Sequence, residues 1–209
     1  GEWILTGTER MKNRPIQILF DALRTLGGQP EYMEKEGYPP LKITGTTLKG
    51  GEITLDGSIS SQYISALLMI APKMHDGLKI TLSGTVISKP YIHLTLSLMK
   101  EFGIESNWTG HTISIAPQAY KPTPFVVESD WSAASYWYQM AALCDNQEIE
   151  LLGLNENSYQ GDARLTEIFT LLGVATHYTE GGVLLRKQKE HCERFVYDFV
   201  DQPDLAQTF

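Results

Sequence analysis

Three polar side chains, Ser60, Ser61 and Gln62, stand together where an apolar helix is expected to begin. Residues 53–55 alternate as a half-buried strand does, and apolar residues within 64–71 recur at helical spacing. A helix start carries unpaired N–H groups and the positive end of the dipole, and hydroxyl and amide groups there add donors without adding charge. The pattern indicates a neutral cradle for a phosphorylated compound with hydroxyl groups. A plain helix cap fits the same residues.

The composition limits the class of protein. The chain has 209 residues, of which 42% are hydrophobic and 20% charged, enough to bury a core in one or two domains. A formal net charge of -8 at pH 7 argues against a broad nucleic-acid or bilayer surface. No apolar run reaches the length of a membrane span, and Cys144 and Cys192 lack metal-ligand spacing. We expect a cytoplasmic protein with free thiols.

An internal repeat organises the chain. A strand, a loop and a helix that ends at glycine recur in three places, at residues 4–27, 80–103 and 149–173. A pair of short strands is predicted after each helix, at 30–32 with 41–43, 105–108 with 112–115, and 176–178 with 183–185. The turns Thr109-Gly110 and Gly181-Gly182 are expected to join the later two pairs.

The second and third copies of the repeat carry an additional strand and helix upstream, at 52–71 and 125–143. A fourth copy is expected to begin with a strand at 195–198 and to reach only a helix at 205–209. The sequence therefore predicts an α/β protein of repeated β-α-β-α-β-β arrangement, incomplete at both ends. Because Pro122 and Pro124 resist both helix and central strand, we expect domains at 1–123 and 124–209.

Five segments carry a family resemblance: Arg10-Met11-Lys12-Asn13-Arg14-Pro15-Ile16, Asp56-Gly57-Ser58-Ile59-Ser60-Ser61-Gln62, Ser88-Lys89-Pro90-Tyr91-Ile92, Asn157-Ser158-Tyr159-Gln160-Gly161-Asp162 and Pro203-Asp204. In this order they resemble the 5-enolpyruvylshikimate-3-phosphate synthase family, and the resemblance covers essentially the whole chain.

The resemblance implies the enolpyruvyl transferase fold, an inside-out α/β barrel of two globular halves whose helix N-termini converge on a cleft. Residues 1–123 would hold the later part of the first half, on the shikimate 3-phosphate side, and residues 124–209 the opening part of the second. The implied reaction transfers the enolpyruvyl group of phosphoenolpyruvate to shikimate 3-phosphate on the way to chorismate. Helix dipoles and side-chain donors would hold both anions without a metal or other cofactor. The implied enzyme is a monomer acting on small molecules, without nucleic acid or membrane.

Site residues are carried over from the family one by one. Ser60 and Ser61 match the pair that holds the phosphate of shikimate 3-phosphate, and Ser88 matches a further phosphate donor. Gln62 matches a residue that touches both substrates, which suits an amide with two donors and an acceptor. Tyr91 matches a ring that lines the shikimate pocket, although an ordinary aromatic residue at a helix start is nearly as good an account.

Charged residues complete the implied site. Arg14 matches the arginine that binds phosphoenolpyruvate, and its planar fork of donors suits carboxylate or phosphate. A solvated arginine before a helix fits the same residue. Lys12 and Arg10 are candidates only for adding positive potential. Asp204 matches a catalytic carboxylate beside the 5-hydroxyl of shikimate 3-phosphate, where it would accept the hydroxyl proton or orient the hydroxyl, and later help remove the methyl proton. An ordinary aspartate at a helix start fits the same residue. Asp162 is expected to cap the helix over residues 164–172, a structural role.

Two other functions stay open. A sister enzyme transfers enolpyruvyl to a UDP-linked N-acetylglucosamine, although Ser60-Ser61-Gln62 and Ser88-Lys89-Pro90-Tyr91 favour shikimate 3-phosphate. A non-catalytic anion-binding domain is the other alternative. Because the family's N-terminal Lys-Ser-Arg set, its glycine-rich loop and its later lysine, glutamate and arginine are absent from the sequence, we expect no transferase activity from this chain alone.

Overall fold

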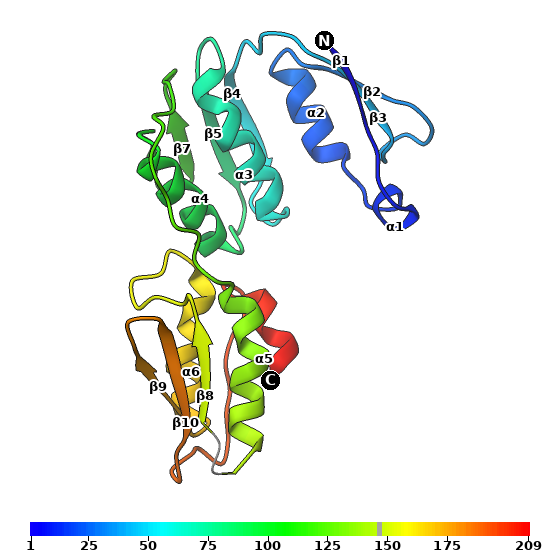
Figure 1. Ribbon diagram of the computed structural model, residues 1–209. Coiled ribbons are helices and arrows are strands. Elements are labelled where there is room, and N and C mark those ends of the chain that lie inside the picture. The colour runs from blue at the N-terminus through cyan, green and yellow to red at the C-terminus, as the bar shows by residue number, and fades with distance from the viewer. Residues whose placement is uncertain (146–147) are drawn as a thin grey trace. The chain divides into compact units, whose positions relative to one another are not determined.

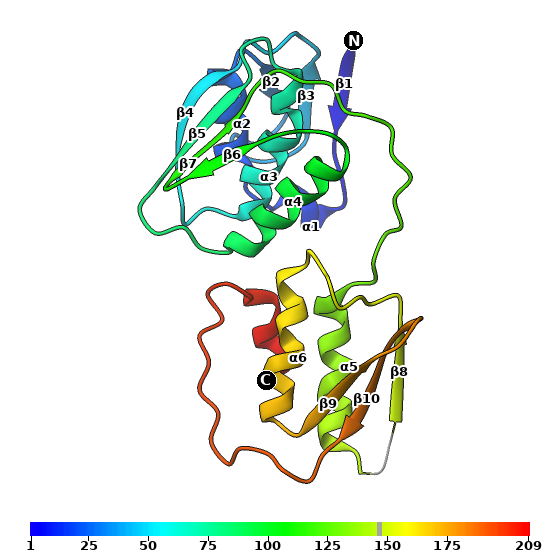
Figure 2. The ribbon, with the colours of Figure 1, turned by 90° about the vertical axis from the view of Figure 1, so that its left-hand side faces the viewer.

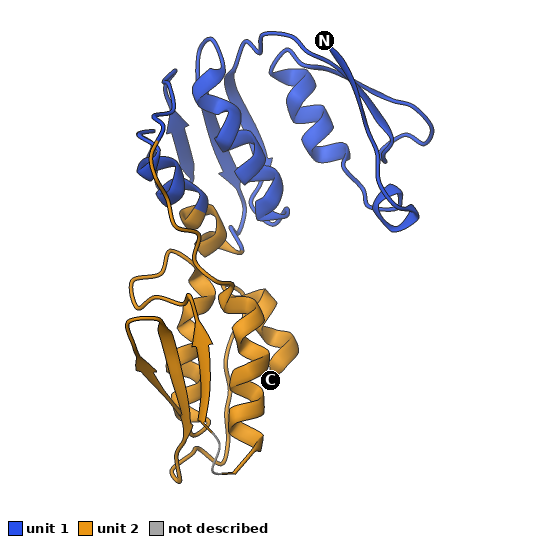
Figure 3. Cartoon of the chain, in the orientation of Figure 1, with its two compact units in different colours: residues 1–87, 95–122 blue, residues 88–94, 123–209 orange. Residues whose placement is uncertain are grey.

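The computed structural model describes residues 1–145 and 148–209, which form two compact units (Figure 3). The first unit comprises residues 1–87 and 95–122, and the second comprises residues 88–94 and 123–209. Helix α4 (Lys89–Glu101) therefore contributes residues to both. The sequence predicts a single boundary at residue 123, whereas the structure also groups the start of α4 with the second unit.

The first unit contains two sheets, shown in Figure 1. In chain order, its other elements are β1 (Glu2–Leu5), α1 (Glu9–Lys12), α2 (Gln17–Thr25), β2 (Gln29–Tyr32), β3 (Leu41–Thr44), β4 (Gly51–Asp56), α3 (Ser61–Ile70), the 3-10 helix η1 (Ala71–Lys73), β5 (Leu78–Ser83), β6 (Asn107–Thr109) and β7 (Thr112–Ile115). One sheet is antiparallel with the order β1-β3-β2, and the other has the order β4-β5-β7-β6 with β4 parallel to β5.

The four-stranded sheet follows the apolar pattern of the sequence. In β5, Leu78, Ile80 and Leu82 are buried on one face, where α3 and α4 lie (Figures 1 and 2). Ile64 and Leu67 are the buried face of α3. Asp56 and Ser83 are paired as the last residues of the parallel strands β4 and β5. The start of α3 at Ser61 therefore follows soon after this edge of the sheet.

The second unit is one antiparallel sheet with helices packed on one of its faces (Figure 2). Its elements are α5 (Trp131–Leu143), β8 (Glu148–Leu152), the 3-10 helix η2 (Gly161–Arg164), α6 (Leu165–Leu171), β9 (Val174–Tyr178), β10 (Gly182–Lys187) and the 3-10 helix η3 (Pro203–Thr208), with the strand order β8-β10-β9. Trp131 and Tyr138 of α5 and Phe169 of α6 are buried in its core. At the start of α5, the N-cap Asp130 accepts from the Ser132 N–H at 2.8 Å.

The predicted repeat is confirmed by the sheet topology. The orders β1-β3-β2, β5-β7-β6 and β8-β10-β9 share one connectivity, in which the last strand of each copy lies in the middle. Glycines end the helices at Gly27, Gly103 and Gly173 with φ of +94°, +80° and +83°, a conformation that side chains disfavour. The turn between β6 and β7 lies one residue later than predicted, at 110–111.

Two expected strands do not form. The structure forms no strand at residues 125–127, and Val126 is 90% exposed. A backbone bond from the Ser129 N–H to the Gly153 carbonyl at 2.8 Å joins the end of this segment to the loop after β8. Pro122 and Pro124, which precede the segment, have no N–H group to donate, and this weakens strand pairing where the strand would begin.

The segment expected to open a fourth copy is also not a strand. Instead, Phe195, Tyr197 and Phe199 pack their rings against the core of the second unit, and Phe195 and Phe199 contact the ring of Phe209. The helix expected at 205–209 is the 3-10 helix η3, which begins at Pro203. Ring packing therefore holds this segment in irregular structure.

Two glycines allow the strands of the four-stranded sheet to begin close together. Gly50 has φ of +81°, and a Cβ atom there would lie 2.1 Å from the Gly77 carbonyl oxygen. Gly77 has φ of +66° and would meet the Ile115 carbonyl oxygen at 2.3 Å. The carbonyl oxygens of Gly77 and Ile115 therefore occupy the space that a Cβ atom would need at Gly50 and at Gly77. In the part of the chain that the structure describes, no helix is long and apolar enough to cross a membrane.

Candidate functional site

The loop between β4 and α3 is fixed by hydrogen bonds on both sides. The Asp56 carboxylate accepts from the Ser58 N–H at 2.8 Å and from the Ser58 hydroxyl at 2.7 Å. The Gly57 N–H donates to the Ser83 carbonyl at 2.7 Å, and the Ile87 N–H donates to the Gly57 carbonyl at 3.1 Å. The backbone that leads into α3 therefore has a defined path before any ligand arrives.

The predicted cradle lies at the start of α3. Ser60 is the N-cap and accepts from the Gln62 N–H at 3.3 Å, and Ser61 is the first helical residue. Ser60 and Gln62 are exposed and Ser61 is half-buried. Capping uses an oxygen lone pair of Ser60 and leaves its O–H to donate. The capping and anion-binding interpretations are therefore compatible, because the same hydroxyl can serve both.

Replacing Ser60 with alanine should lower the free energy of unfolding by about 1 kcal/mol, because α3 loses its side-chain cap. Urea unfolding of the 209-residue chain measures this loss. Ser61→Ala is the matched control and should leave stability unchanged, because the Ser61 hydroxyl has no partner among the described residues. An equal loss in the two variants would contradict the assignment of Ser60 as the cap.

Arg14 is brought near this helix start by a tyrosine. The Tyr63 hydroxyl in the first turn of α3 donates to the Pro15 carbonyl, so residues 14–15 lie beside the cradle. The Arg14 side chain is exposed and forms no ion pair within residues 1–145 and 148–209. Its guanidinium is therefore available to an external anion.

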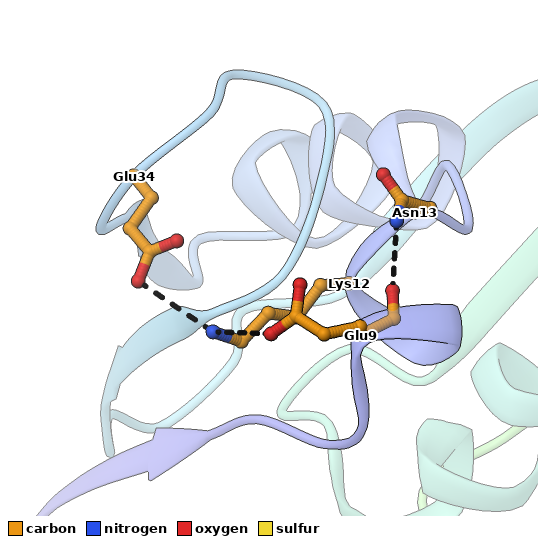
Figure 4. Close-up of polar contacts among 4 residues, drawn as sticks. All are labelled: Glu9, Lys12, Asn13 and Glu34. Carbon is orange, nitrogen blue, oxygen red and sulfur yellow. Dashed lines mark hydrogen bonds and ion pairs between the residues drawn. The ribbon is translucent and has the colours of Figure 1, made fainter.

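Lys12 contributes less free charge than the sequence suggests (Figure 4). Its ammonium lies 3.5 Å from the Glu9 carboxylate and 3.9 Å from the Glu34 carboxylate. The Asn13 side chain donates to the Glu9 carbonyl at 2.8 Å, which closes the short helix α1. Two acidic neighbours offset the charge of Lys12, which leaves Arg14 as the stronger candidate for binding an anion.

In the second unit, Ser88 stands immediately before α4 in an unusual conformation. Its φ is +54°, the only positive φ of a non-glycine residue among those described. The Ser88 N–H donates to the Val200 carbonyl at 3.2 Å, and the Tyr91 N–H donates to the Ser88 carbonyl at 3.2 Å. These bonds hold a conformation that costs about 1–3 kcal/mol, and such strain is common where a side chain is aimed at a ligand.

Tyr91 binds a buried carboxylate. Its hydroxyl donates to both oxygens of Asp162, each at 3.1 Å, and the Ser132 hydroxyl donates to the same carboxylate. Burial and the charges of Asp162 and Asp204 raise the pKa of Tyr91. Burial also raises the pKa of Asp162, and its two hydroxyl donors oppose that shift.

Asp204 is the second residue of η3 and its side chain is exposed. Its charge raises the pKa of both Tyr91 and Asp162. The structure therefore brings Tyr91 and Asp204 together and ties Ser88 to the segment that leads to Asp204. Arg14, Ser60, Ser61 and Gln62 form a separate group within the first unit.

The predicted role of Asp162 as a helix cap is wrong. η2 precedes α6, the N-cap position of η2 is Gln160, and the Asp162 side chain is 2% exposed and turned to Tyr91 and Ser132. An aspartate near a helix start gives the same sequence signal whether it caps or is buried. No pattern in the sequence could have separated the two.

The segment before Asp162 has the structural role that the sequence predicts. The Glu128 carboxylate accepts from the Trp131 indole N–H at 2.8 Å, from the Ser158 hydroxyl at 2.6 Å and from the Gln160 amide at 3.0 Å. Gln160 also accepts from the Trp131 N–H at 2.9 Å. This network joins the starts of α5 and η2 and so fixes Ser132 and Asp162. The described residues contain no cluster of three metal-ligating side chains.

Comparison with known proteins gives one consistent family. The model of the family EPSP synthase (3-phosphoshikimate 1-carboxyvinyltransferase) matches residues 1–209. A 3-phosphoshikimate 1-carboxyvinyltransferase of Bacteroides fragilis is 59% identical over 210 residues, which cover 100% of this chain and 51% of that protein. One from Vibrio vulnificus is 43% identical and is covered to 49%. The chain spans about half the length of the curated relatives it matches.

Solved structures support the fold. EPSP synthase from Acinetobacter baumannii superposes with a TM-score of 0.69 at 20% identity, over 99% of this chain and 47% of that one. The enolpyruvyl transferase NikO from Streptomyces tendae gives a TM-score of 0.64 at 15% identity, over 90% of this chain and 44% of that one. The expected α/β fold of enolpyruvyl transferases is confirmed.

Proposed function

The chain belongs to the EPSP synthase (3-phosphoshikimate 1-carboxyvinyltransferase) family, and on this premise we propose that it serves the transfer of enolpyruvyl from phosphoenolpyruvate to shikimate 3-phosphate. The single observation that carries the proposal is the match of the family to the whole chain, residues 1–209. We also propose that the reaction is cytoplasmic, since Cys144 and Cys192 are free thiols, and that the enzyme is a monomer.

Shikimate 3-phosphate is proposed to place its phosphate at the start of α3. Ser60 and Ser61 would donate hydroxyl protons to it, and Gln62 would bond hydroxyl groups of both substrates with its amide. The positive end of the helix dipole of α3 lies at this place and adds to the attraction for an anion. Arg14, held nearby by the Tyr63 contact with Pro15, would bind phosphoenolpyruvate through its guanidinium fork.

Three further residues are proposed to contact shikimate 3-phosphate. Ser88 would donate to the phosphate, Tyr91 would line the ring of the shikimate, and Asp204 would stand beside the 5-hydroxyl. In the proposed reaction, that oxygen bonds to C2 of phosphoenolpyruvate while C3 gains a proton. Loss of a proton from the new methyl group and departure of phosphate then restore the double bond. Asp204 would accept the hydroxyl proton and later assist removal of the methyl proton.

The whole activity requires more anion-binding groups than these residues supply. Arg14 is the single cation assigned here to phosphoenolpyruvate, a substrate with several negative charges. We therefore expect the 209-residue chain to release no phosphate from a mixture of the two substrates. We expect turnover when residues 1–209 replace the 210 matched residues of the Bacteroides fragilis relative.

Phosphate release by this chimera is the test of the proposed function. The unaltered relative is the positive control. Its rate should exceed that of the chimera by no more than about tenfold, which corresponds to a difference of about 1.4 kcal/mol in activation free energy. A chimera that folds but does not turn over would overturn the proposed function. Turnover by the isolated chain would show that Arg14 is enough cationic charge to bind phosphoenolpyruvate, contrary to our expectation.

A further inference from the structure

Asp162 is a buried carboxylate whose side-chain contacts are hydroxyl groups. It is 2% exposed, and among the described residues it is the only acid in the buried class. No ion pair within residues 1–145 and 148–209 includes it. A buried charge without a cation costs stability unless hydrogen bonds satisfy it. The hydroxyl groups that bond Asp162 must therefore supply this compensation.

Two hydroxyl groups from different helices donate to this carboxylate. The Tyr91 hydroxyl, in the first turn of α4, lies 3.1 Å from each carboxylate oxygen. The Ser132 hydroxyl, in the first turn of α5, donates to one of the two oxygens. A hydroxyl has one proton to donate. The protons of Tyr91 and Ser132 are therefore both committed to Asp162.

Backbone hydrogen bonds fix both ends of the contact between Ser132 and Asp162. The Ser132 N–H donates to the Asp130 carboxylate at 2.8 Å. Gln160, two residues before Asp162, accepts from the Trp131 N–H at 2.9 Å. These bonds join the starts of α5 and η2. The Asp162 carboxylate is therefore held in place before Tyr91 contacts it.

A glycine lets the start of α4 come close enough for this contact. A Cβ atom on Gly161 would lie 2.2 Å from the Cβ of Pro90. A side chain at Gly161 would therefore push η2 away from the start of α4. Tyr91 follows Pro90 and Asp162 follows Gly161, so the close approach of the two backbones brings the hydroxyl to the carboxylate.

We propose that Asp162 is a positioning residue that takes the Tyr91 hydroxyl proton and so fixes the Tyr91 ring in the orientation that lines the shikimate. The part that concerns substrate rests on the proposed function. Binding a phosphate requires a donor, and the proton that Tyr91 could offer is already used by Asp162. Tyr91 therefore meets the carbon ring of shikimate 3-phosphate and does not donate to its phosphate.

The rate at which the Tyr91 hydroxyl proton exchanges with water tests the hydrogen bond in the 209-residue chain. NMR measures it from the deuterium isotope shift of the tyrosine Cζ signal, which Tyr91→Phe assigns. Asp162→Leu should speed the exchange about tenfold, as expected for one lost hydrogen bond. Asp162→Asn keeps one oxygen that can accept, so its rate should fall between those of Asp162→Leu and the unaltered chain.

The Tyr138 hydroxyl is the internal control. It belongs to the core of the same unit and lies 2.8 Å from the Thr176 hydroxyl. Equal acceleration at Tyr91 and Tyr138 would show general loosening of the unit and would overturn the proposal. So would a Tyr91 proton that exchanges no faster in Asp162→Leu. If Asp162→Leu does not fold, Asp162→Asn decides the matter, because it keeps the side-chain shape and must still exceed the rate of the unaltered chain.

Asp130→Asn is the matched control variant. It removes a nearby negative charge and keeps an oxygen that can accept from the Ser132 N–H. The exchange of the Tyr91 proton should therefore be unchanged. An acceleration equal to that of Asp162→Leu would assign the effect to the loss of charge, and the proposal would fail.

Kinetics of the chimera test the role toward substrate. Tyr91→Phe and Asp162→Leu should each raise the KM for shikimate 3-phosphate about 3- to 10-fold and change kcat less. The double variant should raise KM no more than the larger of the two single effects, because both changes remove the same hydrogen bond. A higher KM in Tyr91→Phe with an unaltered KM in Asp162→Leu would mean that Tyr91 donates its proton to the substrate. That result would overturn the proposal.

The exchange measurements need no substrate, so they separate two kinds of failure. An inactive chimera with the expected exchange rates would end the proposed function and leave Asp162 as the residue that holds the Tyr91 hydroxyl. An active chimera with a Tyr91 proton insensitive to Asp162 would do the reverse.

Discussion

Replacing Asp204 with asparagine in the active chimera should lower kcat by about 10²- to 10⁴-fold, the usual contribution of a positioned general base. Asparagine can orient the 5-hydroxyl but cannot take its proton. Because the Asp204 side chain is exposed, the fold should be unaffected. The KM for shikimate 3-phosphate should change much less than kcat. Initial rates of phosphate release over a range of substrate concentrations separate the two constants.

Asp201→Asn is the control for Asp204→Asn. Asp201 is an exposed acid three residues earlier in the same segment, and it has no assigned contact with substrate. It removes the same charge from the neighbourhood and should leave kcat unchanged. A similar loss in both variants would mean that net charge, rather than proton transfer at Asp204, limits the rate.

A second large effect is expected from Gly50→Ala, which should reduce the free energy of unfolding of the first unit by at least about 3 kcal/mol. The added Cβ would lie 2.1 Å from the Gly77 carbonyl oxygen and 2.9 Å from the Met74 Cβ, on a backbone with φ of +81°. Since the obstructing atom is backbone, the strands β4 and β5 would have to separate. Urea unfolding compares the variant with the unaltered chain.

The next residue provides the matched control. Gly51 also has a positive φ, +115°, but a Cβ there would meet nothing within 4 Å. Gly51→Ala should therefore cost only the backbone strain, about 1–3 kcal/mol. The difference between the two variants isolates the close approach of Gly50 to Gly77. Equal losses would show that backbone strain alone explains both.

The repeat could be predicted from the sequence because its signals are local. Apolar alternation, helical spacing and a glycine after each helix recur with the same meaning in every copy, and the structure forms the sheets that they indicate. The cradle is local in the same sense. Ser60, Ser61 and Gln62 precede an apolar helix, and the structure places them at its start.

Features that depend on a distant partner could not be predicted in this way. The segment at Phe125–Val127 has the apolar residues of a strand, but a strand exists only where a neighbouring strand accepts its hydrogen bonds. Asp162 differs from a capping aspartate only through Tyr91 and Ser132, which lie far away in the sequence. The link from Tyr63 to Pro15 likewise joins residues of separate copies. The resemblance to a family supplied the roles of single residues, which periodicity does not specify.

The N-cap residues of α3 and α5 give two similar helix starts different electrostatic properties. Helices α3 and α5 begin at equivalent places, and each N-cap accepts from the N–H two residues later. Ser60 does so as a neutral group, whereas Asp130 does so as a carboxylate. A carboxylate at a helix start already occupies the positive end of the dipole and repels a second anion. The residue at the cap is therefore enough to give the two helix starts different affinities for an anion.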